Sequence, residues 1–75
     1  EEIEVMLDLA DVYIMSNQDG KAEKIYQEML KKYPNEYRIY QGLSKIEINR
    51  HNYEKAAEYR DESLKIMTKM KKRKK

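Results

Sequence analysis

The side chains with reactive potential are few, and their spacing does not assemble a catalytic group. His51 is the single histidine, and it lies in an expected turn between two helices. Ser44 lies seven residues before it, about 10 Å away along a helix that rises about 1.5 Å per residue. A nucleophile and its base need to lie about 3 Å apart. Asp61 and Glu62 are adjacent, so they point in different directions from a helix and form no carboxylate pair.

Other classes of chemical site are also missing from the pattern. The chain has no cysteine, which excludes disulfides and thiolate metal ligands. Gly20 and Gly42 stand apart and form no glycine-rich phosphate loop. Gly42 falls inside an expected helix, where it costs about 1 kcal/mol relative to alanine, so we expect it to serve a close helix approach or to leave room in a groove. The sequence therefore predicts no enzyme, no cofactor and no metal site.

Charged side chains form two rows with helical spacing. Glu4, Asp8 and Asp11 recur at i, i+4 and i+7, which places them on one face of a helix. A 34-residue shift leads to a second row, basic at both ends: Arg38, Gly42 and Lys45, with Gln41 and Asn49 beside them. Apolar side chains accompany the rows: Leu7, Ile14, Met15 and Ile48. Two interpretations stay open. The rows neutralise each other, each exposed pair contributing about 0–1 kcal/mol, or they form a groove for a partner of mixed charge.

The hydrophobic pattern predicts four helices. Apolar residues recur at spacings of three and four in the segments 3–16, 20–33, 36–50 and 53–70. The composition agrees, because charged residues make up 40% of a chain that holds only two glycines and one proline. Pro34 cannot continue a helix and marks a turn. Three residues at the breaks are expected N-caps: Asp19, Asn35 and Asn52. Short connections of this kind predict antiparallel neighbouring helices.

One sequence motif occurs twice in the chain. KAEKIYQEMLK (21–31) returns as KAAEYRDESLK (55–65), which defines a 34-residue period. The same shift aligns Leu9 with Leu43, Ile14 with Ile48, Val5 with Ile39 and Val12 with Ile46. Helix pairs of this length bury their apolar faces by stacking on one another. The sequence therefore predicts one small domain (1–70) in two repeats, 3–36 and 37–70, followed by a basic tail, 71–75.

These residues resemble the tetratricopeptide repeat family over nearly the whole chain. The first copy carries the family's large and small positions at Met6, where tryptophan is usual, and at Leu9, Ala10, Tyr13, Ala22, Tyr26, Met29 and Pro34. The second copy carries them at Tyr40, Leu43, Ser44, Tyr53, Ala56 and Ser63. The departures lie in the second copy: Glu47 for a tyrosine, Arg60 for an aromatic residue and Thr68 for a proline.

The resemblance implies an all-α fold of two stacked antiparallel helix hairpins, an α-solenoid fragment with an extended C-terminal helix. Such proteins are generally scaffolds or adaptors, whose concave groove, lined by the first helix of each repeat, holds a peptide or helix of a partner protein. The corresponding positions here are Glu4, Leu7, Asp8, Asp11, Ile14, Met15, Arg38, Gln41, Lys45, Ile48 and Asn49. One subclass grips the C-terminal carboxylate of heat-shock chaperones with lysine and asparagine. Leu7 and Asp11 occupy those places here, which disfavours such a clamp.

The two ends of the expected stack differ. Apolar residues of the first helix spread over about 220° of the helical wheel, whereas one packed neighbour needs a stripe only about 100° wide. Ser44 and Glu47 interrupt the equivalent face of the third helix, and Arg60 lies in the fourth, which predicts a polar C-terminal end. We expect the C-terminal end of a longer array, or association with a second copy. The face involved comprises Ile3, Val5, Met6, Leu9 and Val12.

The basic tail comprises Lys71, Lys72, Arg73, Lys74 and Lys75. It has three interpretations: a solvated helix end, a nuclear-import signal, or a nucleic-acid contact. Residues 1–37 carry a net charge of −5 and residues 38–75 carry +7. The alternative function is thus a nucleic-acid-associated helical-repeat protein that contacts phosphates through the tail, although no aromatic residue accompanies it for base stacking. We expect an intracellular protein, cytoplasmic or nuclear, with no membrane span because the longest apolar stretch is short.

Overall fold

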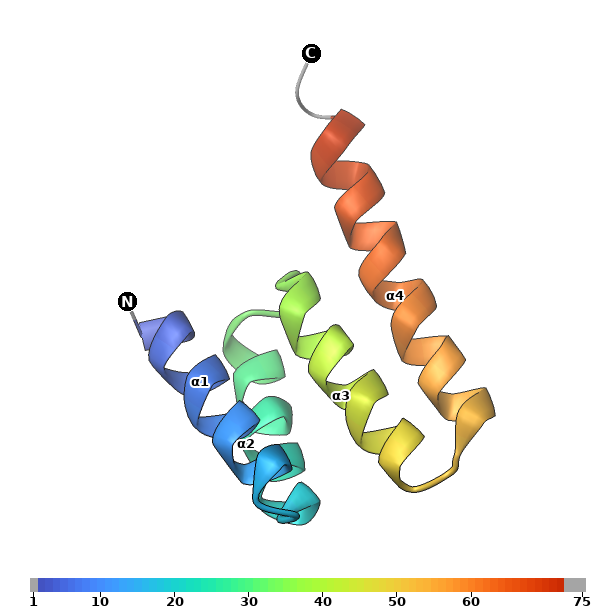
Figure 1. Cartoon of the computed structure of the whole chain (residues 1–75). Coiled ribbons are helices and arrows are strands. Elements are labelled where there is room, and N and C mark those ends of the chain that lie inside the picture. Colours follow the sequence, from blue (N-terminus) through green and yellow to red (C-terminus); the bar gives the residue numbers. More distant parts are fainter. Residues whose placement is uncertain (1, 73–75) are drawn as a thin grey trace.

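Four helices form two antiparallel hairpins in the computed structural model, which describes residues 2–72 with the side chain of Lys72 excepted. The helices are α1 (Glu2–Met15), α2 (Asp19–Lys32), α3 (Tyr37–Asn49) and α4 (Tyr53–Lys72), and the described residues form no strand. Figure 1 shows α1 and α3 running in the same direction, and α4 running back along α3 and extending past its N-terminal end. The predicted all-α fold is confirmed, and the expected helix bounds differ from the observed ones by at most two residues.

The two hairpins turn through the same backbone geometry. Asn17 and His51, which occupy equivalent positions of the two repeats, have positive φ angles of 65° and 63°. At each position, the N–H groups of that residue and of the next one donate to carbonyls three and five residues back. The N···O distances are 3.1 and 2.8 Å in the first hairpin, and 2.9 and 2.8 Å in the second. This is the Schellman arrangement that ends a helix with one left-handed residue. The period of the sequence is therefore also a period of the backbone.

Two of the three expected N-caps, Asp19 and Asn35, are wrong. Gln18, not Asp19, precedes α2, and its side chain makes no capping bond. Asp19 instead lies in the first turn, where an acidic side chain interacts favourably with the helix dipole. Its Oδ1 atom is buried without a partner among the described residues. Glu36, not Asn35, caps α3, because its carboxylate accepts from the backbone N–H and the guanidinium of Arg38 together. Asn52 directly precedes α4, as expected.

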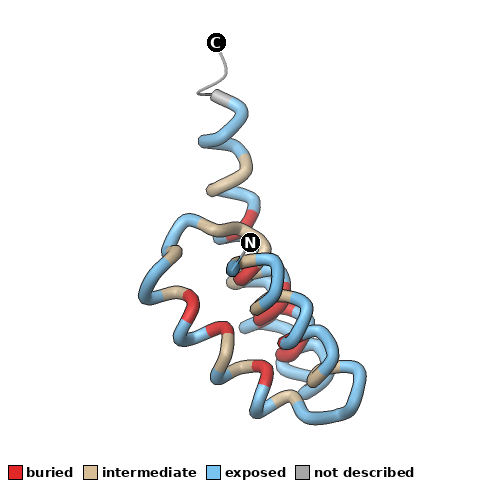
Figure 2. The backbone as a smooth tube through the Cα atoms, turned by 90° about the vertical axis from the view of Figure 1, so that its left-hand side faces the viewer, coloured by how far each residue is buried: buried red, intermediate tan, exposed pale blue. Residues whose placement is uncertain are grey.

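The core lies where α1, α2 and α3 meet. Its fully buried residues are Ala10, Ala22, Tyr26, Met29, Ile39, Leu43 and Ile46. Figure 2 shows that buried residues recur at helical intervals and that each helix also has an exposed side. The small side chains on α1 and α2 let these helices approach closely, while the branched side chains of α3 fill the space between them. This packing holds α1 and α3 side by side, with α2 behind them.

The polar face expected on α3 is wrong, because Ser44 and Glu47 are both buried. The Ser44 hydroxyl donates to the backbone carbonyl of Ala56 on α4 at 2.9 Å. Glu47 pairs with Arg50 at 3.5 Å, and Arg50 also donates to Glu23 on α2 at 2.8 Å. Buried polar groups are tolerated when they find such partners. Ser44 therefore joins α3 to α4, and Glu47 is connected to α2 through Arg50, while Arg60 is exposed as expected.

Candidate partner-binding groove

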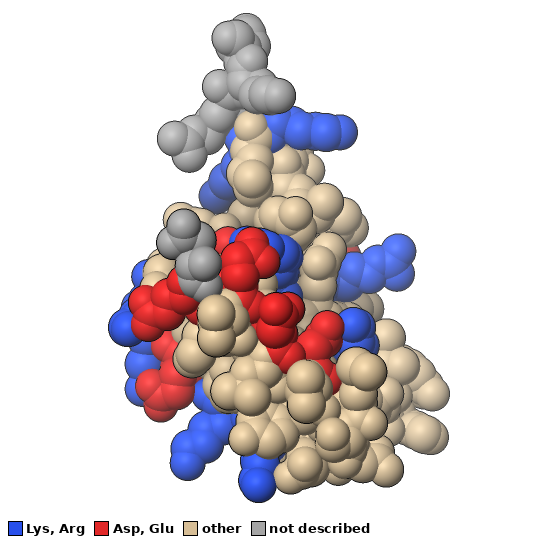
Figure 3. Space-filling view, turned by 60° about the vertical axis from the view of Figure 1, so that its left-hand side comes forward, with Lys and Arg blue, Asp and Glu red and all other residues tan. Residues whose placement is uncertain are grey.

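Two ion pairs join the acidic row of α1 to the basic row of α3. Arg38 Nη1 lies 3.0 Å from Glu4 Oε2, and Lys45 Nζ lies 3.7 Å from Asp11 Oδ1. In both pairs the partners are separated by one full period of the sequence, so they occupy equivalent positions of the two repeats. Figure 3 shows acidic side chains gathered on this side of the molecule, with basic side chains next to them. The structure thus brings the two predicted rows into direct contact.

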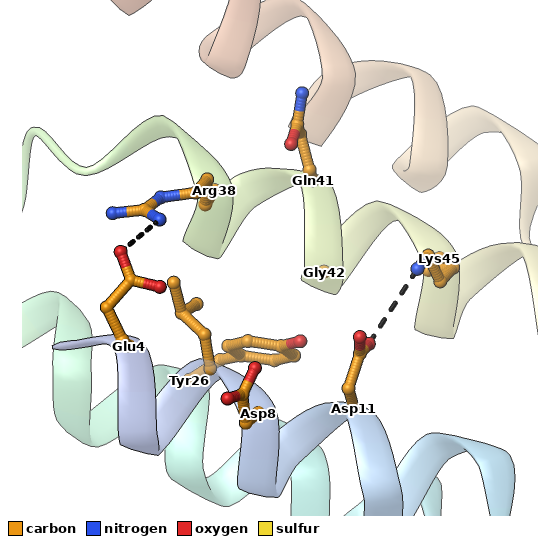
Figure 4. Close-up of a pocket in the computed structure, with 9 residues that line it drawn as sticks. Glu4, Asp8, Asp11, Tyr26, Arg38, Gln41, Gly42 and Lys45 are labelled. Atoms are coloured by element: carbon orange, nitrogen blue, oxygen red, sulfur yellow. Dashed lines mark hydrogen bonds and ion pairs between the residues drawn. The ribbon is translucent and has the colours of Figure 1, made fainter.

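A cavity of about 410 Å³ opens between the two ion pairs. Figure 4 shows it bounded by α1 on one side and α3 on the other, with the ring of Tyr26 from α2 behind it. Seven of the predicted groove residues line this cavity: Glu4, Leu7, Asp8, Asp11, Arg38, Gln41 and Lys45. Tyr26 and Gly42 complete the lining. Sequence analysis missed the place of Tyr26 in this site, because an aromatic residue on the second helix of a repeat is expected in the core alone.

The other four predicted groove residues lie outside the cavity. Ile14 is half-buried against the core, while Met15, Ile48 and Asn49 are exposed. All four are at or near the C-terminal ends of α1 and α3, beyond the second ion pair. The cavity therefore occupies only the part of the expected groove nearer the helix N-termini.

Gly42 is the position that makes room for the Tyr26 ring beside this cavity. A Cβ atom added there would lie 2.6 Å from Cε2 of Tyr26, with Cζ and Oη closer still. Real Cβ atoms do not approach other atoms so closely, and the ring is buried, so it has little room to move. Gly42 therefore allows α3 to pass over the Tyr26 ring. Gly20, in contrast, has no atom within 4 Å of an added Cβ.

The surroundings of the cavity shift the pKa values of Glu36, Arg38 and Tyr26. Hydrogen bonds from Arg38 lower the pKa of Glu36, and bonds to Glu36 and Glu4 raise the pKa of Arg38. Burial, and then the negative charge of Asp11, raise the pKa of Tyr26 to about 12. At neutral pH Glu36 and Arg38 are accordingly charged, and the phenol of Tyr26 is protonated.

The outer face of α1 was predicted to contact a preceding repeat or a second copy. Val5, Leu9 and Val12 on this face are exposed. Ile3 and Met6 are half-buried and pack against the core, so they belong mainly to the hairpin itself. A shallow hollow of about 380 Å³ continues this face onto α2 and is lined by Met6, Leu9, Tyr13, Lys21, Lys24, Ile25 and Glu28. The exposed apolar surface is thus formed by three of the five predicted residues.

The remaining predicted features lie on α4 and in the turns. Lys71 is exposed near the end of α4, and Lys72 is its last residue. Arg73, Lys74 and Lys75 lie outside the described residues, so the interpretation of the tail as a nucleic-acid contact stays a prediction. His51 is exposed in its turn, where its ring stacks on Tyr53 with centroids 6.0 Å apart. Within residues 2–72, no helix combines the length and the apolar character that crossing a membrane requires.

Comparison with known protein families agrees with this architecture. A family model described as tetratricopeptide repeat matches residues 3–46, which is more than half of the chain. The match ends within α3, before Glu47, Arg60 and Thr68, the departures from the family pattern. No curated protein and no solved structure matched the chain. Tetratricopeptide repeats generally mediate protein–protein interaction or scaffolding, and they are typically not enzymes. From the matching model, the repeated helix pair and the shared turn geometry, we conclude that this chain belongs to the tetratricopeptide repeat family.

Proposed function

We propose that this domain binds a peptide or helix of a partner protein in the groove between α1 and α3. The observation that carries the proposal is the cavity between the two ion pairs, because equivalent helices of both repeats line it together. A binding module needs a concave surface with a few well-placed polar groups, and this cavity combines both.

The ion pairs support partner binding better than they support a purely structural role. All four side chains of the two pairs are more than a third exposed, and exposed pairs contribute only about 0–1 kcal/mol to stability. Charges of an incoming segment can therefore replace one member of a pair at small cost. The two interpretations of the rows are then compatible, since the charges neutralise each other in the free domain and are available to a partner of mixed charge.

Charge reversal in the groove tests the proposal. Peptides selected from a random library on the immobilised domain serve as ligands, and titration calorimetry measures their affinity. The variant Arg38→Glu with Lys45→Glu should weaken binding about tenfold or more, because it reverses two charges that face the ligand. Unchanged affinity would contradict the groove and favour another face of the domain.

A matched control places the same charge change elsewhere. Lys24 and Lys31 are also seven residues apart, but they lie on α2. The variant Lys24→Glu with Lys31→Glu should leave the affinity within about twofold, as expected for charges far from the ligand. A fold-preserving variant, Asp11→Lys with Lys45→Glu, keeps an ion pair while reversing its direction. It should also lose affinity without losing helicity.

We also propose that the outer face of α1 packs against a further helix pair, as at the C-terminal end of a longer repeat array. This part of the proposal is supported by the exposure of Val5, Leu9 and Val12. At the other end of the stack, α4 presents charged side chains to solvent, among them Arg60 and Asp61. A second copy of the chain is the alternative occupant of the α1 face, and the oligomeric state in solution distinguishes the two.

A further inference from the structure

The acidic row has one member more than the basic row, and that member lies at the centre of the cavity. Glu4 and Asp11 each have a cation opposite them on α3. Asp8 lies between them, and the position opposite it, one repeat later, is Gly42, which has no side chain. Within residues 2–72, Asp8 takes part in no ion pair. The middle position of the groove is thus a carboxylate with no cation opposite it on α3, and it lines the gap between the two ion pairs, which is the cavity described above.

A second group in the same gap also lacks a partner. Tyr26 lines the cavity although only 2% of its surface is exposed. Its hydroxyl makes no hydrogen bond to another residue in the described part of the chain. Figure 4 shows this hydroxyl directed into the space between α1 and α3, beside Asp8 and Asp11. The hydroxyl opens onto the cavity without a partner among the described residues, so it is available to bond to a ligand atom that enters there.

The charges around the gap select the sign of that ligand atom. The cavity lining carries three carboxylates and two cations: Glu4, Asp8, Asp11, Arg38 and Lys45. Arg38 is shared with a further carboxylate, Glu36, at 2.6 Å. The local balance is therefore negative, which favours a cation and disfavours a carboxylate or phosphate.

We infer that the gap between the two ion pairs receives a lysine or arginine side chain of the bound segment, whose charged end bonds to Asp8 and to the hydroxyl of Tyr26. The inference rests on the proposed function, because it names the part of the partner that the groove recognises. A phenol oxygen and a carboxylate both accept hydrogen bonds from such a cation.

The dimensions of the gap fit this occupant. The two ion pairs are seven residues apart on each helix, about 10 Å at about 1.5 Å per residue, so one side chain enters between them. The Tyr26 ring occupies the space beside Gly42, so the aliphatic stem of a lysine or arginine is received in the cavity of about 410 Å³ that this ring lines. Such stems pack on apolar surface while their charged ends bind polar groups.

Two short peptides that differ in one charge test the inference on the whole chain. The probe Ac-Gly-Gly-Lys-Gly-Gly-NH2 is titrated into isotope-labelled protein, and amide chemical shifts are followed by NMR. The lysine peptide should cause saturable shifts at Asp8 and Gly42. The same peptide with norleucine in place of lysine has the stem but not the charge, and it should cause none. Equal shifts with norleucine, or shifts confined to another part of the surface, would overturn the inference.

Three substitutions distinguish specific binding of the cation in this gap, from here on called the slot, from general attraction to an acidic surface. Asp8→Asn keeps the shape of the side chain and should weaken lysine binding about fivefold to tenfold, since it removes the charge that pairs with the ligand. Tyr26→Phe removes only the hydroxyl and should weaken it about twofold to fivefold. Asp61→Asn removes an exposed carboxylate on α4 and should change nothing. An equal loss for Asp8→Asn and Asp61→Asn would contradict a specific slot.

Failure of the slot and failure of the groove give different results. The library-selected peptides are also titrated with Asp8→Asn. If they lose affinity with the charge-reversed groove variant but not with Asp8→Asn, the groove is kept and the slot is overturned. If the lysine peptide binds at Asp8 but the selected peptides are insensitive to both sets of variants, the slot is kept and the proposed function is overturned. Loss of affinity in both sets supports both.

Discussion

The first and second repeats place the same apolar positions in opposite environments. Val5 and Val12 on α1 are 63% and 55% exposed, whereas Ile39 and Ile46, their equivalents one repeat later on α3, are fully buried. The sequences at these positions are alike, and so is the backbone turn that follows each helix. The difference lies in what precedes each helix: α3 packs on the first hairpin, and within the described residues α1 has no hairpin on its outer side. In a stacked array, the preceding helix pair thus covers the apolar face of the next helix. This face is covered on α3 and exposed on α1.

Lysine substitutions at equivalent positions of the two repeats should show the largest difference in stability. Ile39→Lys with Ile46→Lys places two charges in the core, and a buried unpaired charge costs several kcal/mol. A domain of this size has a margin of only about 3–5 kcal/mol, so we expect it to unfold. Val5→Lys with Val12→Lys should keep the helical circular dichroism spectrum and a cooperative melt. If both double variants unfold, the conclusion that Val5 and Val12 are exposed on α1 is wrong.

Alanine substitutions at the two glycines should show a difference in stability of intermediate size. Gly42→Ala should destabilise the domain by about 1–3 kcal/mol, because overpacking against the Tyr26 ring outweighs the gain in helix propensity. Gly20→Ala in α2 should instead stabilise it by about 0.5–1 kcal/mol, since nothing obstructs the new methyl group. Urea unfolding of the two variants measures both values. A gain in stability at Gly42 would show that the Tyr26 ring yields easily.

Sedimentation should show whether the exposed face of α1 is sufficient for association. We expect the chain to self-associate at high concentration, because its exposed valines and Leu9 form a continuous apolar surface. The variant Val5→Lys with Val12→Lys should shift the population toward monomer. A wild-type chain that remains monomeric at every concentration contradicts self-association and leaves a preceding repeat as the occupant.

The end of α4 should have the smallest effect on stability. Met70 and Lys71 are both exposed, and the core contains neither of them. Deletion of residues 71–75 should therefore change the free energy of unfolding by less than about 0.5 kcal/mol, as surface changes usually do. A loss of several degrees in Tm would mean that the tail contacts the body of the domain.

The sequence predicted what depends on local periodicity. Helix bounds follow from apolar spacing within each segment, and the pairing of Glu4 with Arg38 follows from the repeat period that aligns the two rows. The burial of Ser44 and Glu47 was not predictable in the same way. Their type indicates solvent, and only the positions of Ala56 and Arg50 in the folded chain provide their partners. Repeat periodicity describes the position of a residue on its helix, not the groups that the next helix or the end of its own helix brings to it.

The contact between Tyr26 and Gly42 illustrates the same limit. The resemblance to the repeat family assigned the tyrosine to a packing position, and the cost of a glycine inside a helix assigned Gly42 to a close approach or to a groove, but neither indicated that the two meet. A tertiary contact between helices from different repeats depends on their relative rotation and separation. One available signal was a glycine in mid-helix at the position equivalent to a groove carboxylate, which is unfavourable for a helix unless something occupies the space of its side chain.

The central claim is that the groove between α1 and α3 is the binding face, and chemical-shift mapping with a library-selected peptide tests it most directly. The largest amide shifts should cluster at Glu4, Asp8 and Asp11 on α1 and between Arg38 and Lys45 on α3. They should disappear in the variant Arg38→Glu with Lys45→Glu and persist in Lys24→Glu with Lys31→Glu. Shifts that instead follow the outer face of α1 and α2, or the length of α4, would contradict the claim.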